Sequence, residues 1–383
     1  MSENHQPASG PILSRRSLLA SASAFAIVAP QAVRGSQANS RISVGLIGSG
    51  GRGSYDASIV HADPRAAITA LCDKFDDRLE KAKATIKVSN PKTFTDFEKL
   101  LADPSIDAVF IATPPFEHPR MLEAAIESGK HVYCEKPMGV DYAGCRRAMA
   151  AGRKANPKQC VAVGFQQRYG PVYLEAWKRI QEGQIGPIVN ARGSWIAGDP
   201  FHRAVYSDPA IEKLRNWFCY PELSGDIIVE QDCHNFDDLH WFLGATPLKA
   251  VGYGGAKVRT SMQIMDHMTL SFEWPDGIHV NYEANQLCPP GFTHVGEEFT
   301  GTKGVIETSR SRMIHHKSKE EHETIPSKRD ITIDAIEAFL GRILSGDVEN
   351  VVERSAHSTM IAILGRTAIY TGKEVTWKEL YGA

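Results

Sequence analysis

Three glycines that could bring the backbone close to a phosphate group follow an apolar run, Arg41–Ile47. Gly48, Gly50 and Gly53 form a Gly-x-Gly-x-x-Gly pattern directly after that run. Gly48 permits a tight turn, Gly50 lets the backbone approach a pyrophosphate, and Gly53 lets the next helix pack closely on the strand. We therefore predict a dinucleotide-binding loop that opens a helix. The expected cofactor contacts on this loop are Gly48, Gly50, Gly51, Arg52 and Gly53.

A carboxylate ends the second apolar run, Ala66–Asp73. Asp73 lies 20 residues beyond Gly53, which is the spacing of the acidic residue that binds the adenosine ribose hydroxyls. Because a carboxylate repels a 2′-phosphate, Asp73 favours NAD as the cofactor. Lys74 and Arg78 are close enough in sequence to tolerate that phosphate, so NADP stays open.

The glycine loop and Asp73 must lie at one edge of a sheet, and the segments that follow them are expected to form that sheet. The runs Ala108–Pro115 and His131–Cys134 are typical of strands, and Pro119–Ser128 is expected to be the helix between them. Strands that alternate with helices predict a parallel, doubly wound sheet, which binds ligands at the carboxyl ends of its strands. Thr113 and Pro114 lie at such an end and are further expected cofactor contacts.

Composition limits the class of protein and of partner. The chain has 383 residues, of which 42% are hydrophobic and 23% charged, with a formal net charge of −2. These values are typical of a soluble globular protein of about two domains. Without a basic excess to displace counterions, nucleic acid is not expected as a partner.

The first 38 residues carry the features of an export signal. Arg15 and Arg16 end a polar stretch, an apolar run extends over Leu18–Pro30, and Ser36–Ala38 offers small residues for cleavage. This order predicts a twin-arginine signal peptide and a periplasmic or otherwise exported protein. The run is too short for a stable membrane span. A disordered basic tail and an uncleaved anchor are the alternatives.

Export and dinucleotide binding together constrain the cofactor. Little free NAD or NADP exists outside the cytoplasm, and the twin-arginine machinery carries folded proteins. We therefore expect a nucleotide that is bound before export and held tightly. Since the chain would fold in a reducing compartment, its seven scattered cysteines are expected to be buried free thiols, and no metal site is expected.

Several motifs along the chain resemble those of one enzyme family. They are the Gly48 loop, Ala112–Pro114, Glu135-Lys136-Pro137, Gly164–Tyr169, Glu230–Asp237 and Gly301–Gly304. The chain resembles the glucose-fructose oxidoreductase, inositol dehydrogenase and MocA family (Gfo/Idh/MocA) over nearly its whole mature length. The resemblance implies an α/β Rossmann domain followed by an α+β domain with an open, mainly antiparallel sheet, with substrate between that sheet and the nicotinamide.

This resemblance and the residue patterns predict four parts. They are a signal peptide at 1–38, an NAD(P)-binding Rossmann domain at 39–160, a substrate-binding sheet domain at 161–330, and a C-terminal helical segment at 331–383 that packs back on the body. Met268–Trp274 and Ile278–Tyr282 alternate as strands do, with a Pro-Asp-Gly turn between them. Ile331–Leu344 has apolar residues at helical spacing.

The resemblance also implies the catalytic groups. It places Lys136 and His234 beside the reacting hydroxyl, with Glu230, four residues before the histidine, assisting. Oxidation of a secondary alcohol needs a base that titrates near the working pH, which favours His234 as general acid/base. Lys136 would stabilise the developing alkoxide and join the proton relay. The family more often has an aspartate at the position of Glu230. The longer glutamate side chain could therefore orient His234 instead of contacting substrate. The alternatives are that His234 is a histidine of the core and that Lys136 is a lysine of the surface.

Other site residues are expected from the same motifs. The cofactor contacts outside the glycine loop are expected to be Asp73, Thr113, Pro114, His118, Glu135 and Lys136. Family members suggest a cis bond between Lys136 and Pro137. Arg168, Tyr169 and Trp217 are expected to bind substrate, and Asp237 to bind its hydroxyls or to orient His234. An aromatic-rich insert, Trp195–Tyr220, is the kind of segment that shapes a pocket.

Three functions fit these residues. The first is an NAD(P)-dependent oxidoreductase that acts on a secondary hydroxyl of a sugar, with a second carbonyl compound or a separate acceptor regenerating the bound cofactor. The second is a redox-neutral glycoside hydrolase that oxidises C3 transiently and eliminates the leaving group. The third is a non-catalytic binding module, which the joint presence of Lys136, Glu230 and His234 disfavours. By resemblance we expect a homodimer or homotetramer.

Overall fold

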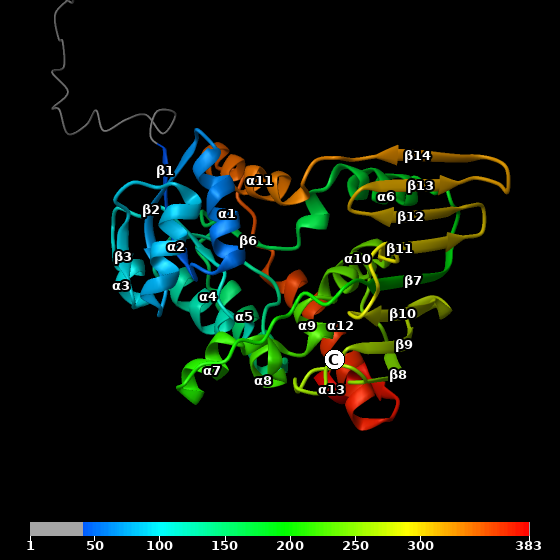
Figure 1. Ribbon diagram of the computed structural model, residues 1–383. Helices are drawn as coiled ribbons and strands as arrows, with labels where there is room; N and C mark the ends of the chain where they lie inside the picture. The colour runs from blue at the N-terminus through cyan, green and yellow to red at the C-terminus, as the bar shows by residue number, and fades with distance from the viewer. Residues whose placement is uncertain (1–40, 383) are drawn as a thin grey trace, which may run out of the picture. The chain divides into compact units, whose positions relative to one another are not determined.

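The computed structural model describes residues 41–382, beginning with the strand that leads into the glycine loop (Figure 1). The predicted signal peptide, residues 1–38, lies outside the described residues. Within 41–382, no helix is both long enough and apolar enough to cross a bilayer.

The first sheet has six parallel strands in the order β3-β2-β1-β4-β5-β6. Their bounds are β1 Ile42–Ile47, β2 Ala66–Cys72, β3 Lys92–Phe94, β4 Ala108–Ile111, β5 His131–Cys134 and β6 Val161–Val163. Both faces of β4 are buried, which explains its uninterrupted apolar sequence. Strand order reverses at β1, where β2 lies on one side and β4 on the other, so a ligand crevice is expected at their carboxyl ends.

Helices cover both faces of this sheet, as the doubly wound prediction requires. They are α1 (Gly51–Ala62), α2 (Asp76–Ile86), α3 (Phe97–Leu101), α4 (His118–Glu127) and α5 (Tyr142–Gly152). The apolar residues of α1 and α2 pack in one core, and those of α3, α4 and α5 pack in another. The strand predicted at Ala108–Pro115 ends at Ile111, because Pro115–Glu117 forms a short 3-10 helix, η1, before α4.

The second sheet has nine strands in the order β14-β13-β12-β11-β7-β10-β9-β8-β15 and is mainly antiparallel, with one parallel pair, β7 and β10. Its strands are β7 Ile188–Ile196, β8 Lys249–Gly255, β9 His267–Glu273, β10 His279–Asn285, β11 His294–Gly301, β12 Val305–Ser309, β13 Arg312–His316, β14 His322–Pro326 and β15 Val375–Thr376. The predicted hairpin is confirmed as the antiparallel pair β9–β10.

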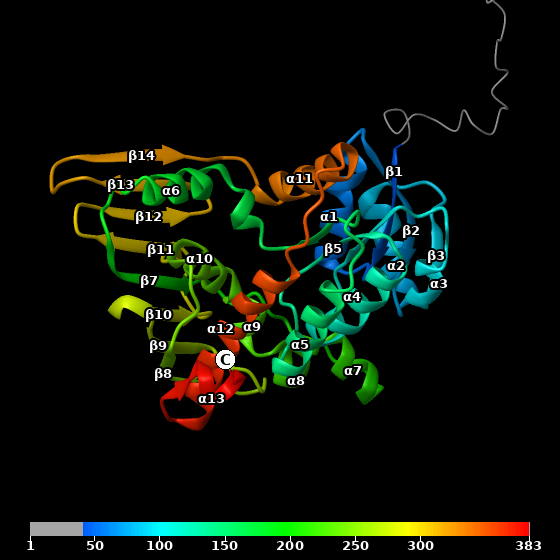
Figure 2. The same ribbon diagram turned by 180° about the vertical axis from the view of Figure 1, so that it is seen from behind.

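One face of the second sheet is covered and the other is open. Buried and exposed residues alternate strictly along β9 and β10, so every second side chain faces solvent. The covering helices are α6 (Pro171–Gln181), α10 (Cys233–Leu243) and α12 (Val352–Thr371) (Figures 1 and 2). The sheet thus positions α10, which carries His234, toward the Rossmann half.

The C-terminal residues contact both sheets. Helix α11 (Ile331–Ser345) packs on the Rossmann side, where Phe339 meets Phe110 and Tyr133 edge-on at ring centroid distances of 5.5 and 5.6 Å. Helix α12 lies between α5, α10 and β8. Strand β15 then joins the edge of the second sheet, and the short helix α13 (Trp377–Tyr381) follows it.

The long connection between β7 and α10 leaves the second sheet. It contains α7 (Pro209–Arg215), a 3-10 helix η3 (Trp217–Cys219), α8 (Pro221–Ser224) and α9 (Ile227–Glu230). Both views place α7 and α8 beside the Rossmann helices α4 and α5 (Figures 1 and 2), and α8 packs against η1. This connection brings residues of the second half to the crevice of the first.

Candidate active site

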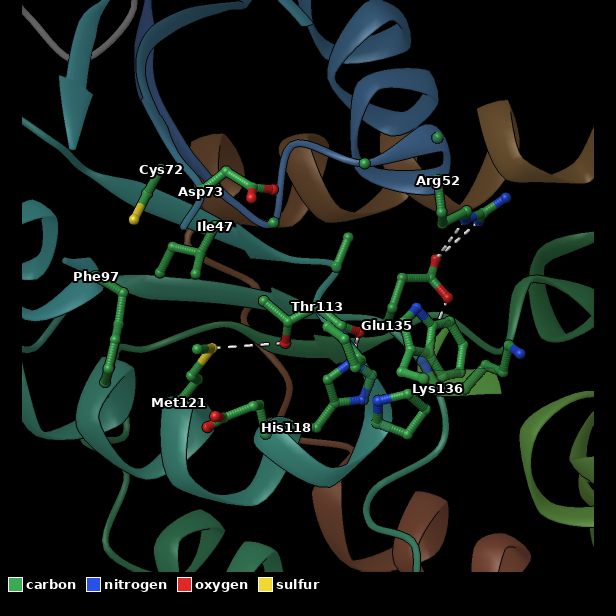
Figure 3. Close-up of a pocket in the computed structure, with 18 of the residues that line it drawn as sticks. Ile47, Arg52, Cys72, Asp73, Phe97, Thr113, His118, Met121, Glu135 and Lys136 are labelled. Carbon is green, nitrogen blue, oxygen red and sulfur yellow. Dashed lines mark hydrogen bonds and ion pairs between the residues drawn. The ribbon is translucent and has the colours of Figure 1, made fainter. Parts of the chain in front are cut away.

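A cavity of about 770 Å³ lies at the carboxyl edge of the Rossmann sheet and is lined by both halves of the chain (Figure 3). The glycine loop, the residues after β2 and the Thr113 loop line one part of it. The other part is lined by polar and aromatic side chains: Glu135, Lys136, Gln166, Trp195, Glu230, His234 and Arg310. The crevice predicted from strand order is therefore a real cavity that faces the second domain.

The glycine loop has the geometry of a phosphate cradle. Gly48 has φ +92°, and a Cβ at Gly53 would lie 2.0 Å from the Gly48 carbonyl oxygen, so neither position accepts a side chain. Gly53 does not line the cavity but packs the helix against the loop. Gly50 caps α1 without a side-chain hydrogen bond, so the first amides of that 12-residue helix are free for a phosphate. These features fit a dinucleotide.

Asp73 is held at the cavity by two backbone amides. Its Oδ2 accepts from Ser49 N at 2.9 Å, and its Oδ1 accepts from Phe75 N at 3.0 Å. Burial raises the pKa of Asp73, although these two hydrogen bonds oppose that change. The carboxylate is thus oriented by the loop and lies beside the glycines, as expected for a ribose ligand. Lys74 and Arg78 line the same end of the cavity.

Arg52 joins the glycine loop to the Glu-Lys-Pro motif. Its Nε and Nη2 donate to Glu135 Oε1 at 2.9 and 2.8 Å, and its Nε lies 3.2 Å from Asp56 Oδ1 (Figure 3 shows the Glu135 pair). Asp56 is completely buried, and its pKa is raised well above the usual value by burial and then by the charge of Glu135. Arg52 therefore contacts two acidic side chains, a role that the glycine pattern alone does not indicate.

His118 lines the cavity and connects two loops of the site. Its Nδ1 lies 2.8 Å from the Pro137 carbonyl oxygen and its Nε2 lies 2.9 Å from the Thr113 carbonyl oxygen. Both ring nitrogens are therefore within hydrogen-bonding distance of backbone carbonyl groups. His118 thus holds the Thr113 loop against the Lys136–Pro137 bond, which is cis as the family suggests.

The proposed acid-base residues meet in the cavity. Lys136 Nζ lies 3.3 Å from Glu230 Oε1 and also donates to the Glu230 main-chain carbonyl. Burial disfavours the charged form of Lys136, but the charge of Glu230, the other negative groups nearby and the hydrogen bond to Glu230 together outweigh it, so the pKa of Lys136 is raised. The lysine therefore stays an ammonium group, and Glu230 is long enough to reach it.

His234 is buried on α10, in an aromatic setting. Its ring stacks on Trp195 at 6.0 Å and meets Phe165 edge-on at 5.9 Å. Its Nδ1 has no hydrogen-bond partner among the described residues. Burial, followed by the charges of Lys136 and Arg310, lowers the pKa of His234 well below the usual value. The imidazole is therefore neutral near neutral pH and can accept a proton.

Three expected substrate residues do not line the cavity. Arg168 Nε and Nη2 donate to the two oxygens of Asp237 at 2.7 and 2.9 Å, and Ser358 Oγ donates to the same carboxylate at 2.6 Å. Tyr169 donates its hydroxyl to Glu349 at 3.1 Å. This placement differs from the expectation, because Arg168 and Asp237 pair with each other and Tyr169 pairs with Glu349. Of the expected substrate residues, Trp217 does line the cavity.

Other residues of the wall lie where a polyol would need partners. Trp195 Nε1 and Gln166 Oε1 are buried with no hydrogen-bond partner in the described part of the chain. Arg310, from the turn between β12 and β13, lies over the Trp195 ring with its guanidinium carbon 5.4 Å from the ring centroid. Neighbouring motifs pointed to Gln166 and Trp195, whereas nothing in the sequence around Arg310 marks it.

The described residues hold no group of three or more His, Cys, Asp or Glu side chains that could bind a metal ion. All seven cysteines are free, and Cys288 alone is not fully buried.

The fold and this site define a class, the NAD-dependent oxidoreductases that act on CH–OH groups. Two family models place the chain within it. "Oxidoreductase family, NAD-binding Rossmann fold" matches residues 42–165, and "GFO/IDH/MocA C-terminal domain" matches residues 173–307. The two models cover well over half of the chain between them. The chain belongs to the Gfo/Idh/MocA family.

Several proteins that are similar to this chain are named as dehydrogenases of inositols or of levoglucosan. Scyllo-inositol 2-dehydrogenase (NAD(+)) of Bacillus subtilis strain 168 is 28% identical over 302 residues, which are 78% of this chain and 80% of that protein. The solved myo-inositol 2-dehydrogenase from Lactobacillus plantarum is 23% identical, with a TM-score of 0.72. Levoglucosan dehydrogenase in complex with NADH and levoglucosan is 18% identical, with a TM-score of 0.74. Each structural match covers 88% of this chain and 99% of the other, and together they confirm the two-sheet fold.

Proposed function

We propose that this protein oxidises a secondary hydroxyl of a sugar or cyclic polyol, with NAD held tightly through turnover. The observation that carries the proposal is the meeting of Lys136, Glu230 and His234 in the cavity onto which the glycine loop opens. The named inositol and levoglucosan dehydrogenases among its relatives and structural neighbours support this substrate class.

The chain supplies the proton chemistry, and bound NAD supplies the hydride acceptor. His234 is neutral and accepts the hydroxyl proton at a ring nitrogen. The Lys136 ammonium stabilises the negative charge that develops on the substrate oxygen, and Glu230 keeps that lysine charged and oriented. Trp195 and Phe165 enclose the histidine and limit access of water. The unpartnered Gln166 Oε1 and Trp195 Nε1 are suited to bind further hydroxyls.

The proposal includes export, retention and assembly. Arg15-Arg16 and the apolar run after it support export by the twin-arginine machinery to the periplasm or beyond. A protein outside the cytoplasm needs a resident nucleotide, for which Asp73 favours NAD while Lys74 and Arg78 leave NADP open. The open face of the second sheet, where Tyr253 is 75% exposed, supports pairing into a homodimer or homotetramer.

A purification without added cofactor tests the function. Absorbance in the reduced-nicotinamide band is recorded while inositols, sugars and aryl glycosides are added in turn. A band that rises with a polyol and falls with a carbonyl acceptor supports the dehydrogenase. Release of aglycone without net reduction identifies the redox-neutral glycosidase instead. If no nucleotide co-purifies, tight retention is refuted, although added NAD still tests the chemistry.

A further inference from the structure

Part of the cavity wall comes from a segment of the second half that leaves its own sheet. Residues 199–224, here termed the strap, cross from β7 to the Rossmann half and contribute Leu214 and Trp217 to the cavity lining. We propose that the strap is a cofactor-retaining element, in which Arg215 clamps the loop that carries Asp73. The inference rests on the proposed retention of NAD and assigns that retention to named residues.

Arg215 makes one of the contacts that join the two halves. Its Nη1 and Nη2 donate to the two oxygens of Asp77 at 2.9 and 2.5 Å, in a bidentate pair. Its guanidinium carbon lies 4.0 Å from the Phe75 ring centroid and 5.3 Å from that of Tyr206. The guanidinium is thus stacked on aromatic faces while it forms an ion pair, and its side chain is only 15% exposed.

The clamped residues belong to the predicted nucleotide site. Phe75 lines the cavity, and its backbone amide donates to Asp73 Oδ1 at 3.0 Å. Arg215 therefore holds the same turn that orients the Asp73 carboxylate. Because Leu214 and Trp217 flank it in sequence and line the cavity, the clamp also presses these side chains onto the cavity wall.

The strap is stiff enough to act as one piece. Asn216 is buried and links two parts of the strap: Ala204 N donates to Asn216 Oδ1 at 2.9 Å, and Asn216 Nδ2 donates to the Ala204 carbonyl at 2.7 Å. Phe201 stacks on Phe218 at 4.9 Å. Asp199 anchors the beginning of the strap through Arg259 at 3.0 Å.

The far end of the strap is also attached to the Rossmann half, because α8 packs against η1 in the Thr113 loop. The strap thus contacts the loops after β2 and β4, which lie on either side of the glycine loop. A nucleotide that leaves the cavity must either pass beside the strap or displace it. Loss of the Arg215 clamp should therefore speed dissociation more than it slows chemistry.

The expected change in the NADH dissociation rate follows from the strength of the contacts that Arg215 makes. An exposed ion pair contributes little, but a bidentate arginine stacked on an aromatic ring contributes more. Replacing Arg215 by alanine should therefore raise the NADH dissociation rate roughly threefold to thirtyfold. Arg215→Lys keeps the charge without the planar fork and should give an intermediate rate. The matched control is Arg153→Ala, which removes an exposed pair with Glu353 at 2.8 Å that does not line the cavity.

The experiment measures NADH release from the full-length protein by stopped-flow fluorescence, with excess NAD as competitor. A faster rate in Arg215→Ala, a smaller increase in Arg215→Lys and an unchanged rate in Arg153→Ala support the clamp. A charge-swapped double variant, Arg215→Asp with Asp77→Arg, should recover part of the slow release. Thermal unfolding of each variant identifies any that has lost its fold. If Arg215→Ala is unfolded, the release rate of Arg215→Lys is compared with that of the wild type instead.

The results that would refute the Arg215 clamp differ from those that would refute the proposed function. If Arg215→Ala and Arg153→Ala release NADH at the wild-type rate, the clamp is refuted even where the protein oxidises polyols. If the wild-type protein exchanges NADH freely while Arg215→Ala exchanges it faster still, the clamp stands and retention through turnover is refuted. If wild-type protein does not bind NADH, both are refuted.

Discussion

Lys136 and Glu230 form an ion pair that crosses from the Rossmann half to the second half, with Nζ 3.3 Å from Oε1. Lys136 follows β5, whereas Glu230 ends α9, and both side chains are mostly buried. The pair favours the charged form of the group that would stabilise an alkoxide, and it joins the two halves at the site.

Glu230→Gln should lower kcat/KM by roughly tenfold to a hundredfold, because a charged hydrogen bond to Lys136 is lost. Without that negative charge the pKa of Lys136 falls, so the alkaline limb of the pH profile should move to lower pH. Glu230→Asp keeps the charge and should retain more activity than the glutamine variant. A profile whose alkaline limb is the same in all three proteins would contradict this role for Glu230.

His234→Ala should lower kcat by about a hundredfold to ten-thousandfold, the usual effect of losing a general base. The NADH dissociation constant should change little, because the glycine loop and Asp73 are untouched. Fluorescence titration with NADH measures binding, and steady-state turnover of a polyol measures chemistry. Unchanged turnover would remove His234 from the mechanism.

Arg310→Ala should move the acidic limb of the pH profile to higher pH. In the wild-type protein, burial and then the charges of Lys136 and Arg310 lower the pKa of His234, so the base stays neutral well into acid. Without Arg310 the pKa rises, and activity is lost at a higher pH as the solution is acidified. Arg310→Lys retains the charge and serves as the control, with a limb near that of the wild type.

Arg168→Ala should destabilise the protein by about 3 kcal/mol or more, because it leaves the buried Asp237 carboxylate without its bidentate partner. Arg192→Ala breaks an exposed pair with Glu298 and should cost less than about 1 kcal/mol. Urea unfolding of both variants makes the comparison. If the two variants are equally stable and only Arg168→Ala has a raised KM for substrate, Arg168 is a substrate ligand after all.

Gly53→Ala should destabilise the protein by about 3 kcal/mol and weaken NADH binding, since its Cβ would lie 2.0 Å from the Gly48 carbonyl oxygen. At Gly51, an added Cβ meets nothing within 4 Å, so Gly51→Ala should keep the unfolding free energy within about 1 kcal/mol. Thermal or urea unfolding, followed by NADH titration, distinguishes the two. Equal loss of stability in both variants would show that the close approach at Gly53 is not the cause.

Local sequence predicted the nucleotide loop of the Rossmann half, four of the six strands of its sheet and the helix between β4 and β5. The glycine spacing, the apolar run before it and Asp73 are near one another in the chain, and each has a backbone requirement that few residue types satisfy. The hairpin of β9 and β10 was predictable for a similar reason, because alternation with a Pro-Asp-Gly turn specifies both strands and their pairing. Motifs such as Glu135-Lys136-Pro137 then indicated the family.

Long-range packing decided what the motifs could not. Arg168, Tyr169 and Asp237 belong to two of the family motifs, yet Arg168 and Asp237 pair with each other, and residues of the C-terminal segment bind Asp237 and Tyr169. His118 lines the cavity as expected, but the sequence did not indicate that its ring would join the Thr113 and Pro137 carbonyl groups.

The sequence by itself determined the nucleotide loop, the two kinds of sheet and the identity of the lysine, glutamate and histidine. Only the tertiary structure decided that Glu230 reaches Lys136, that Arg310 approaches the wall beside His234, and that Arg215 clamps Phe75 and Asp77. The reason is physical: backbone conformation and burial follow local patterns. Pairing of polar side chains depends instead on which segments the packed core brings within hydrogen-bonding distance.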